Sequence, residues 1–223
     1  MSVRDAARNA FEQQTDALVR DERFHRLETG AASPDDYDRF VANVFITHAH
    51  SPRYLAFLYS VAPPAAADRI RGNLLEELGE TGTVRVSHPD LLADLVRAAG
   101  LADRLPALRR EADERLRQAI GERLIYASLR EVGFAALCEI TAFEFMLSRL
   151  AGRMAAALST HRGLEATRLT WFSHHAEVDV RHAEEGLDSI QDYVEHHRIG
   201  SEDAAALLDM ALRENVFIRR YLE

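Results

Sequence analysis

The sequence contains no lysine, because all 27 of its basic residues are arginine. Without a lysine ε-amine the chain cannot form a Schiff base, which excludes pyridoxal-phosphate enzymes and Class I aldolases. The only cysteine, Cys138, cannot form an internal disulfide, so the chain fits a reducing compartment. No run of about 18 or more apolar residues occurs, and we therefore expect no transmembrane helix.

Basic residues are also in the minority, with 36 acidic residues and a formal net charge of -9. An acidic chain repels phosphate backbones and anionic lipids, so we expect neither nucleic acid nor a membrane as a partner. Residues 1–8 lack the basic start and apolar run of a secretory signal, which favours the cytoplasm. With 47% hydrophobic residues, the sequence predicts one domain over 1–223 with a sizeable core.

Glycine and proline are few, and alternating β-type runs are nearly absent, so the sequence predicts an all-α fold. The breakers divide it into a bundle of seven to eight helices. We expect helices over about 3–26, 34–60 with a bend at Ser51 and Pro52, 64–78, 88–100, a charged stretch over 109–122, 124–158, 165–197, and from 201 to the C-terminus.

Three metal-ligand residue types recur at helical spacing near the end of the chain, at His175, Asp179 and His182. At about 100° per residue, positions i, i+4 and i+7 fall within an arc of roughly 60° on one helix face. This spacing predicts half of a dinuclear metal site.

Other helices offer inward ligands. Glu77 ends one predicted helix and His88 begins the next, while Glu139 is a lone acid in an apolar segment, where burial is costly unless a cation is near. With the triplet, three carboxylates would bring a charge of -3 to two divalent ions. Mixed oxygen and nitrogen ligands suit iron or manganese.

Three pieces of sequence carry a resemblance to a known family: 73–79 followed by His88, 133–139, and 171–172 followed by the triplet. With them, the chain resembles the haem-oxygenase-like di-iron oxidases, which include CADD-like proteins and iron-containing redox enzymes and share the TenA/PqqC-like fold. The pieces span 73–182, about half of the chain. The resemblance implies a ligand set for two irons at Glu77, His88, Glu139, His175, Asp179 and His182. Glu76 or Glu80 could replace the first glutamate, and Glu144 the second.

The resemblance also implies a biosynthetic oxidoreductase that uses two Fe(II) ions and O2 to oxidise a small amino-acid-like or fatty-acid-like metabolite. The reaction would be an oxidative decarboxylation, a C–C cleavage or an N-oxygenation. Manganese is the alternative metal, an external electron donor could take part, and we expect a homodimer. The CADD-like branch that makes para-aminobenzoate has a tyrosine before the second glutamate and uses a lysine. Here that neighbour is Cys138 and lysine is absent, so we do not expect that reaction.

Three other functions stay open at this point. Thiaminase-like hydrolases of this shape use a cysteine nucleophile, so Cys138 could serve a metal-free hydrolase. A true haem oxygenase would need an axial ligand such as His25. A non-catalytic binding module would use the histidines and acids only for structure.

Overall fold

The computed structural model describes residues 2–121, 126–214 and 216–223. All of the regular secondary structure in these ranges is helical, which confirms the all-α prediction, although the helices are more numerous than expected. They are α1 (Val3–Arg20), α2 (Glu22–Thr29), α3 (Pro34–His48), α4 (Ser51–Val61), α5 (Pro64–Glu77), α6 (His88–Ala98), the short 3-10 helix η1 (Ala102–Arg104), α7 (Leu105–Gly121), α8 (Leu129–Arg162), the 3-10 helix η2 (Ala166–Arg168), α9 (Thr170–His197), α10 (Ser201–Glu214) and α11 (Phe217–Leu222).

The predicted first helix over 3–26 was wrong, because the chain breaks at Asp21. This residue adopts an extended conformation, and its side chain accepts a hydrogen bond from the Arg23 backbone, capping a new helix. The bend predicted at Ser51 and Pro52 is likewise a full break, with His50 between α3 and α4. A capping aspartate at the first break and a proline in the first turn after the second start helices that hydrophobic spacing alone runs together.

Two later boundaries also differ from the predicted ones. Residue 124, the expected start of the long apolar helix, lies outside the described residues, and α8 begins at Leu129 after the N-cap Ser128. The helix predicted from residue 165 begins at Thr170, because η2 occupies the residues before it. The interior of both helices is as expected.

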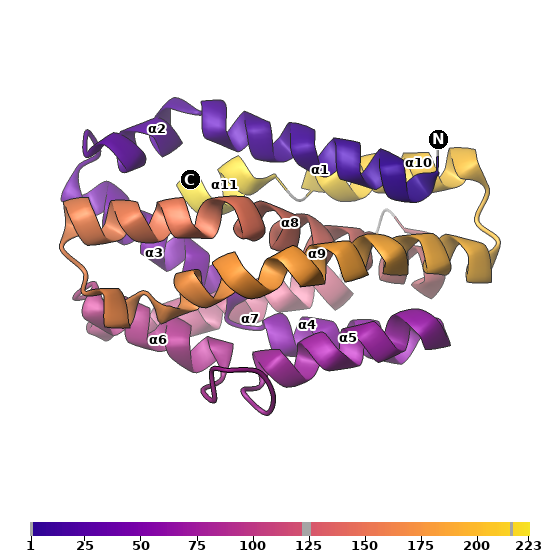
Figure 1. Ribbon diagram of the computed structural model, residues 1–223, viewed down its shortest axis with the longest axis horizontal. Coiled ribbons are helices and arrows are strands. Elements are labelled where there is room, and N and C mark those ends of the chain that lie inside the picture. The colour runs from indigo at the N-terminus through magenta and orange to yellow at the C-terminus, as the bar shows by residue number, and fades with distance from the viewer. Residues whose placement is uncertain (1, 122–125, 215) are drawn as a thin grey trace.

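The long helices α8 and α9 pack against each other along the middle of the molecule (Figure 1). Their close approach depends on Gly186 of α9, where a Cβ atom would collide with the side chain of Thr141 on α8. A larger side chain would force the two helices apart. The pair is the frame on which the candidate site is built.

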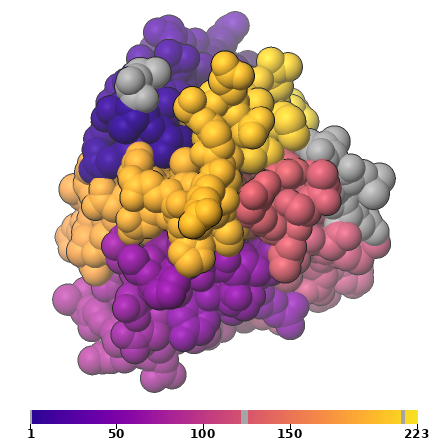
Figure 2. All heavy atoms as spheres, turned by 90° about the vertical axis from the view of Figure 1, so that its right-hand side faces the viewer, coloured from indigo at the N-terminus to yellow at the C-terminus, as the bar shows by residue number. Residues whose placement is uncertain are grey.

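The other helices cover this central pair. Helices α1, α2 and α10 lie on one side, and α4, α5 and α6 lie on the opposite side (Figure 1). Seen from the end of the bundle, the C-terminal part of α9 is held between α1 above and α5 below (Figure 2). None of the described helices is both long and apolar enough to span a membrane.

Most of the interior is apolar, with Trp171, Tyr193 and Phe45 among the fully buried side chains. A group of ionisable residues is buried within it, and these demand partners or a cation, because burying a lone charge is costly. They are His48, Glu77, His88, Glu139, Glu144, His174, His175, Asp179 and His182.

The close contact at Gly186 gives a stability prediction. We expect Gly186→Ala to lower the free energy of unfolding by about 1–3 kcal/mol, because the new methyl group overlaps Thr141. The matched control is Gly152→Ala on α8, where nothing lies within 4 Å of the added Cβ. Because alanine lowers the backbone entropy of the unfolded chain, this substitution should raise the free energy of unfolding by about 0.5–1 kcal/mol. Urea denaturation measures both, and equal effects of the two substitutions would contradict the proposed contact.

Candidate metal centre

Three of the predicted ligands meet in the interior: Glu77 at the end of α5, His88 at the start of α6, and His175 on α9. One ligand atom from each lies within 4.8 Å of the others. Glu77 Oε1 is 2.8 Å from His88 Nδ1 and 3.5 Å from His175 Nε2. All three side chains are buried, so they form the core of a candidate metal site.

The loop between α5 and α6 brings the first two of these residues together. Gly79 adopts a left-handed conformation with φ +74, and a Cβ there would strike the backbone of Val86 and Ser87. The chain therefore folds back tightly on itself. The Ser87 side chain then accepts a hydrogen bond from the Asp90 backbone and starts α6, so that His88 is its first residue beside Glu77.

One ring nitrogen of His88 lacks a protein partner. Its Nδ1 pairs with Glu77 Oε1, whereas its Nε2 is buried and has no hydrogen-bond partner among the described residues. Asp179 Oδ2 is also buried and has no hydrogen-bond partner among the described residues. Buried polar atoms are nearly always hydrogen-bonded or coordinated, and imidazole nitrogen and carboxylate oxygen are metal ligands. These residues therefore fit a bound metal ion.

Outer contacts fix the orientation of the ligand groups. His175 Nδ1 donates a hydrogen bond to the backbone carbonyl of Trp171 at 2.6 Å, which leaves Nε2 directed at Glu77. The hydroxyl of Ser51, the first residue of α4, donates to Glu77 Oε2. Such outer contacts hold the tautomer and the ring plane of a metal ligand before the ion binds.

The other two members of the triplet lie further along α9. His182 Nδ1 is 3.3 Å from Asp179 Oδ1, and His182 Nε2 is 2.5 Å from Glu76 Oε2. Glu144 of α8 accepts a hydrogen bond from the Asn73 side chain and lines the same small cavity as His182. Among the described residues, Glu77, His88 and His175 are the only three whose ligand atoms all lie within 4.8 Å of one another, so these further acids and His182 lie near the site without converging in the same way.

The carboxyl groups of the site repel one another. Burial raises the pKa of Asp179 well above its usual range, and the charges of Glu144 and Glu77 raise it further. Burial also raises the pKa of Glu144 to about 8, although the hydrogen bond from Asn73 opposes this. Glu77 differs: burial by itself would raise its pKa, but His88 and His175 hold it well below the usual range. A divalent cation would relieve this repulsion.

Burial favours the neutral form of His48, His175 and His182. Burial lowers the pKa of His182 to about 4 and that of His48 to about 3, in the second case with repulsion from His175. Burial also lowers the pKa of His175, against the pull of Glu77. Neutral imidazole is the form that binds a metal, so the site is prepared for coordination near neutral pH.

Glu139 belongs to a different set of contacts. The Tyr54 hydroxyl donates to its Oε2 at 2.9 Å, and Arg220 of α11 donates to its Oε1 at 2.6 Å. It is not part of the group formed by Glu77, His88 and His175. Of the alternatives left open by the sequence, Glu144 lies among the acids of the site, Glu76 contacts His182, and Glu80 is exposed.

Several contacts around the site could not be predicted from the sequence. Ser51, Asn73 and Tyr54 each donate a hydrogen bond to an acid on another helix. The partners are far apart in sequence and meet only through tertiary packing. Arg220 follows another arginine near the C-terminus and has no spacing pattern that marks it. His48 is buried among aromatic rings, with its ring centroid 5.1 Å from that of Trp171.

The residues of the two other catalytic hypotheses lie in unfavourable surroundings. Cys138 is fully buried, and burial raises the pKa of its thiol well above the usual value, which disfavours the thiolate that a nucleophile needs. His25 is exposed on α2, away from a buried haem pocket. Neither residue favours a hydrolase or a haem oxygenase.

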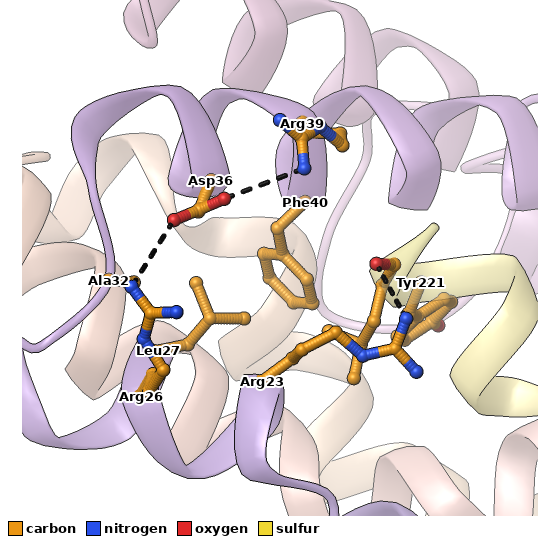
Figure 3. A pocket seen from close by; sticks show the side chains of 9 residues that line it. Arg23, Arg26, Leu27, Ala32, Asp36, Arg39, Phe40 and Tyr221 are labelled. Atoms are coloured by element: carbon orange, nitrogen blue, oxygen red, sulfur yellow. Dashed lines mark hydrogen bonds and ion pairs between the residues drawn. The ribbon is translucent and has the colours of Figure 1, made fainter.

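A basic pocket separate from the candidate metal centre lies between α2, α3 and α11 (Figure 3). Arg26 and Arg39 both face Asp36, and Arg23 donates to the backbone carbonyl of Leu222. The protein itself therefore satisfies these arginines. The buried centre between α5, α8 and α9 remains the better candidate for chemistry.

The electrostatics predict that Glu144 destabilises the metal-free protein. Because its pKa is higher in the folded state than the usual value of about 4.5, stability should fall as the pH rises from about 4.5 to about 8. We expect Glu144→Gln to remove this fall and to raise the free energy of unfolding by about 2 kcal/mol at pH 7, with little effect at pH 4. Urea denaturation in the presence of a chelator tests this, and a variant less stable than wild type at both pH values would contradict it.

Comparison with known proteins gives one family. The model of the family described as iron-containing redox enzyme matches residues 38–214, a range that contains every candidate ligand named above. No curated protein matches the chain at a significant level.

Proposed function

Because the chain belongs to the iron-containing redox enzymes with a haem-oxygenase-like fold, as its motifs indicated, we propose that it is a non-haem di-iron oxidase or oxygenase. It uses O2 to oxidise a small metabolite of the amino-acid or fatty-acid type. The observation that carries this proposal is the convergence of Glu77, His88 and His175 in the interior, where the Nε2 atom of His88 is buried without a hydrogen-bond partner among the described residues.

The converging residues Glu77, His88 and His175 support one ion, and a second ion is proposed beside His182, where further acids lie. Glu77, His88 and His175 would hold the first ion, and Glu144, Asp179 and His182 the second. Three carboxylates against two divalent cations leave a small residual charge, as a buried site requires. Oxygen and nitrogen ligands suit iron, and two Mn(II) ions would fit the same set. When bound, two Fe(II) ions supply the electrons that reduce O2.

The protein's own contribution is positioning and the exclusion of water. Ser51 and the carbonyl of Trp171 hold two ligands in place, and the aromatic core around Trp171 keeps bulk water out. In the metal-free protein, the raised pKa values of Glu144 and Asp179 keep a proton among the acids. Metal binding releases that proton, because the ligands must be deprotonated.

Metal stoichiometry tests the proposal and its ligand set. We expect an anaerobic titration to show two Fe(II) equivalents bound to the wild type, and a transient visible absorption band on exposure to O2. Glu144→Gln should lose at least one equivalent. Glu139→Gln, five residues away on the same helix, should keep both, because its carboxylate is engaged by Tyr54 and Arg220. Tight binding of a single ion would contradict the di-iron proposal, and loss of an ion in Glu139→Gln would return that residue to the ligand set.

Metal binding should also stabilise the fold. With Mn(II) at about 100 times its dissociation constant, we expect about 2.7 kcal/mol of extra stability for each independent site, seen as a higher Tm. His88→Ala removes a ligand of the first ion and should lose a large part of this gain. The control is His161→Ala, an exposed histidine far along α8. An equal gain in Tm for both variants would argue against His88 as a ligand.

A further inference from the structure

A small cavity of about 50 Å³ lies next to the proposed first ion, enclosed by α3, α4, α7, α8 and α11. Ser51 lines this cavity, and its hydroxyl donates to Glu77. His48 also lines it and packs on Trp171, whose ring lies 4.2 Å from that of His175. The cavity is therefore one side chain away from two of the proposed metal ligands, where a substrate would need to sit.

The cavity wall carries an ion pair. Arg220 contacts Glu139 at 2.6 Å, and Tyr54 donates to the other oxygen of that carboxylate at 2.9 Å. The Glu139 side chain is only 5% exposed, whereas that of Arg220 is 23% exposed. Both oxygens of the acid are thus engaged, while the guanidinium has five N–H donors and uses one nitrogen for Glu139.

The short helix that carries Arg220 is fixed in place. Asn43 of α3 donates to the backbone carbonyls of Tyr221 and Glu223, at 3.2 and 2.6 Å. The Tyr221 hydroxyl lies 2.5 Å from His48 Nε2 in the core. An arginine on a fixed helix, with its guanidinium already held by Glu139, loses little conformational entropy when it binds a ligand, which favours recognition.

The charge balance of the cavity is opposite to that of the whole protein. Among the described residues, Arg115 and Arg220 line it with one acid, Glu139, whereas the chain as a whole has a net charge of -9. Apolar side chains form other parts of its wall, including Ile140 and Phe143. Such a cavity suits a small ligand with one negative group and a hydrocarbon part.

We propose that Arg220 binds the carboxylate of the substrate in this cavity, and that Glu139 and Tyr54 are positioning residues that hold its guanidinium. The role of the carboxylate compound as a substrate rests on the proposed function, but its binding does not. A ligand amine would have to compete with Tyr54 and Arg220 for the oxygens of Glu139, because each oxygen already accepts a hydrogen bond. The cavity therefore selects for a carboxylate and against a cation.

The single tryptophan of the chain gives a direct binding assay, because Trp171 packs against His48 in the cavity wall. We expect butanoate to change its fluorescence in the metal-free protein and to bind at least tenfold more tightly than butanamide or butylamine. Arg220→Gln should weaken butanoate binding at least tenfold. Arg213→Gln on α10, whose exposed side chain pairs with Asp209, is the matched control and should bind as wild type does.

Because Arg220→Gln leaves the buried Glu139 without its partner, the double variant Arg220→Gln with Glu139→Gln tests the same point with a neutral pair. It should fold, as judged by circular dichroism, and still lose butanoate binding. Glu139→Gln alone should weaken butanoate binding less than Arg220→Gln does, because the guanidinium is still present although the acid that positions it is gone.

Equal affinity for butanoate and butanamide, or wild-type binding by the double variant, would overturn the assignment of Arg220. The same follows if butanoate binds neither the metal-free nor the Mn(II)-loaded protein. If two Fe(II) equivalents bind but butanoate does not, only this inference fails. If butanoate binds through Arg220 but iron does not, the di-iron proposal fails and the carboxylate site remains.

Discussion

The structure depends on the burial of several acids and imidazoles at the junction of α5, α8 and α9. Burial and mutual repulsion raise the pKa values of Asp179 and Glu144, and His88 Nε2 has no hydrogen-bond partner among the described residues. Such an arrangement is unfavourable in a metal-free interior and becomes favourable when cations neutralise it. The surrounding helices therefore preserve a site whose stability and chemistry both point to metal.

Different helices carry the candidate metal ligands and complete the cavity beside them. Some candidate ligands lie on the long helices α8 and α9, whose close packing depends on Gly186. Glu77 and His88 lie at the ends of α5 and α6, which are joined by a tight loop at Gly79. The cavity beside them is completed by α11, a short helix at the chain end that is tied down by Asn43. A metal site needs fixed geometry, whereas substitution of a single wall residue such as Arg220 can change which ligand a cavity binds.

Much of the fold and part of the site could be predicted from the sequence. The helical spacing of His175, Asp179 and His182 places three candidate ligands on one strip of a helix, and all three are buried. The choice between Glu139 and Glu144 could not be made. Five residues on a helix correspond to a rotation of about 140°, so the two acids face different neighbours, and the surrounding segment is apolar on every side. Which face meets α9 is decided only by packing.

Residue order and type by themselves determined an all-helical chain, the positions of most breaks and the chemical nature of the candidate ligands, because helix periodicity and side-chain chemistry are local properties. Tertiary structure alone decided which acids share a centre, that Cys138 is buried, and that Arg220 meets Glu139 across 81 residues. Contacts at such separations depend on how whole helices pack, and no local pattern records them.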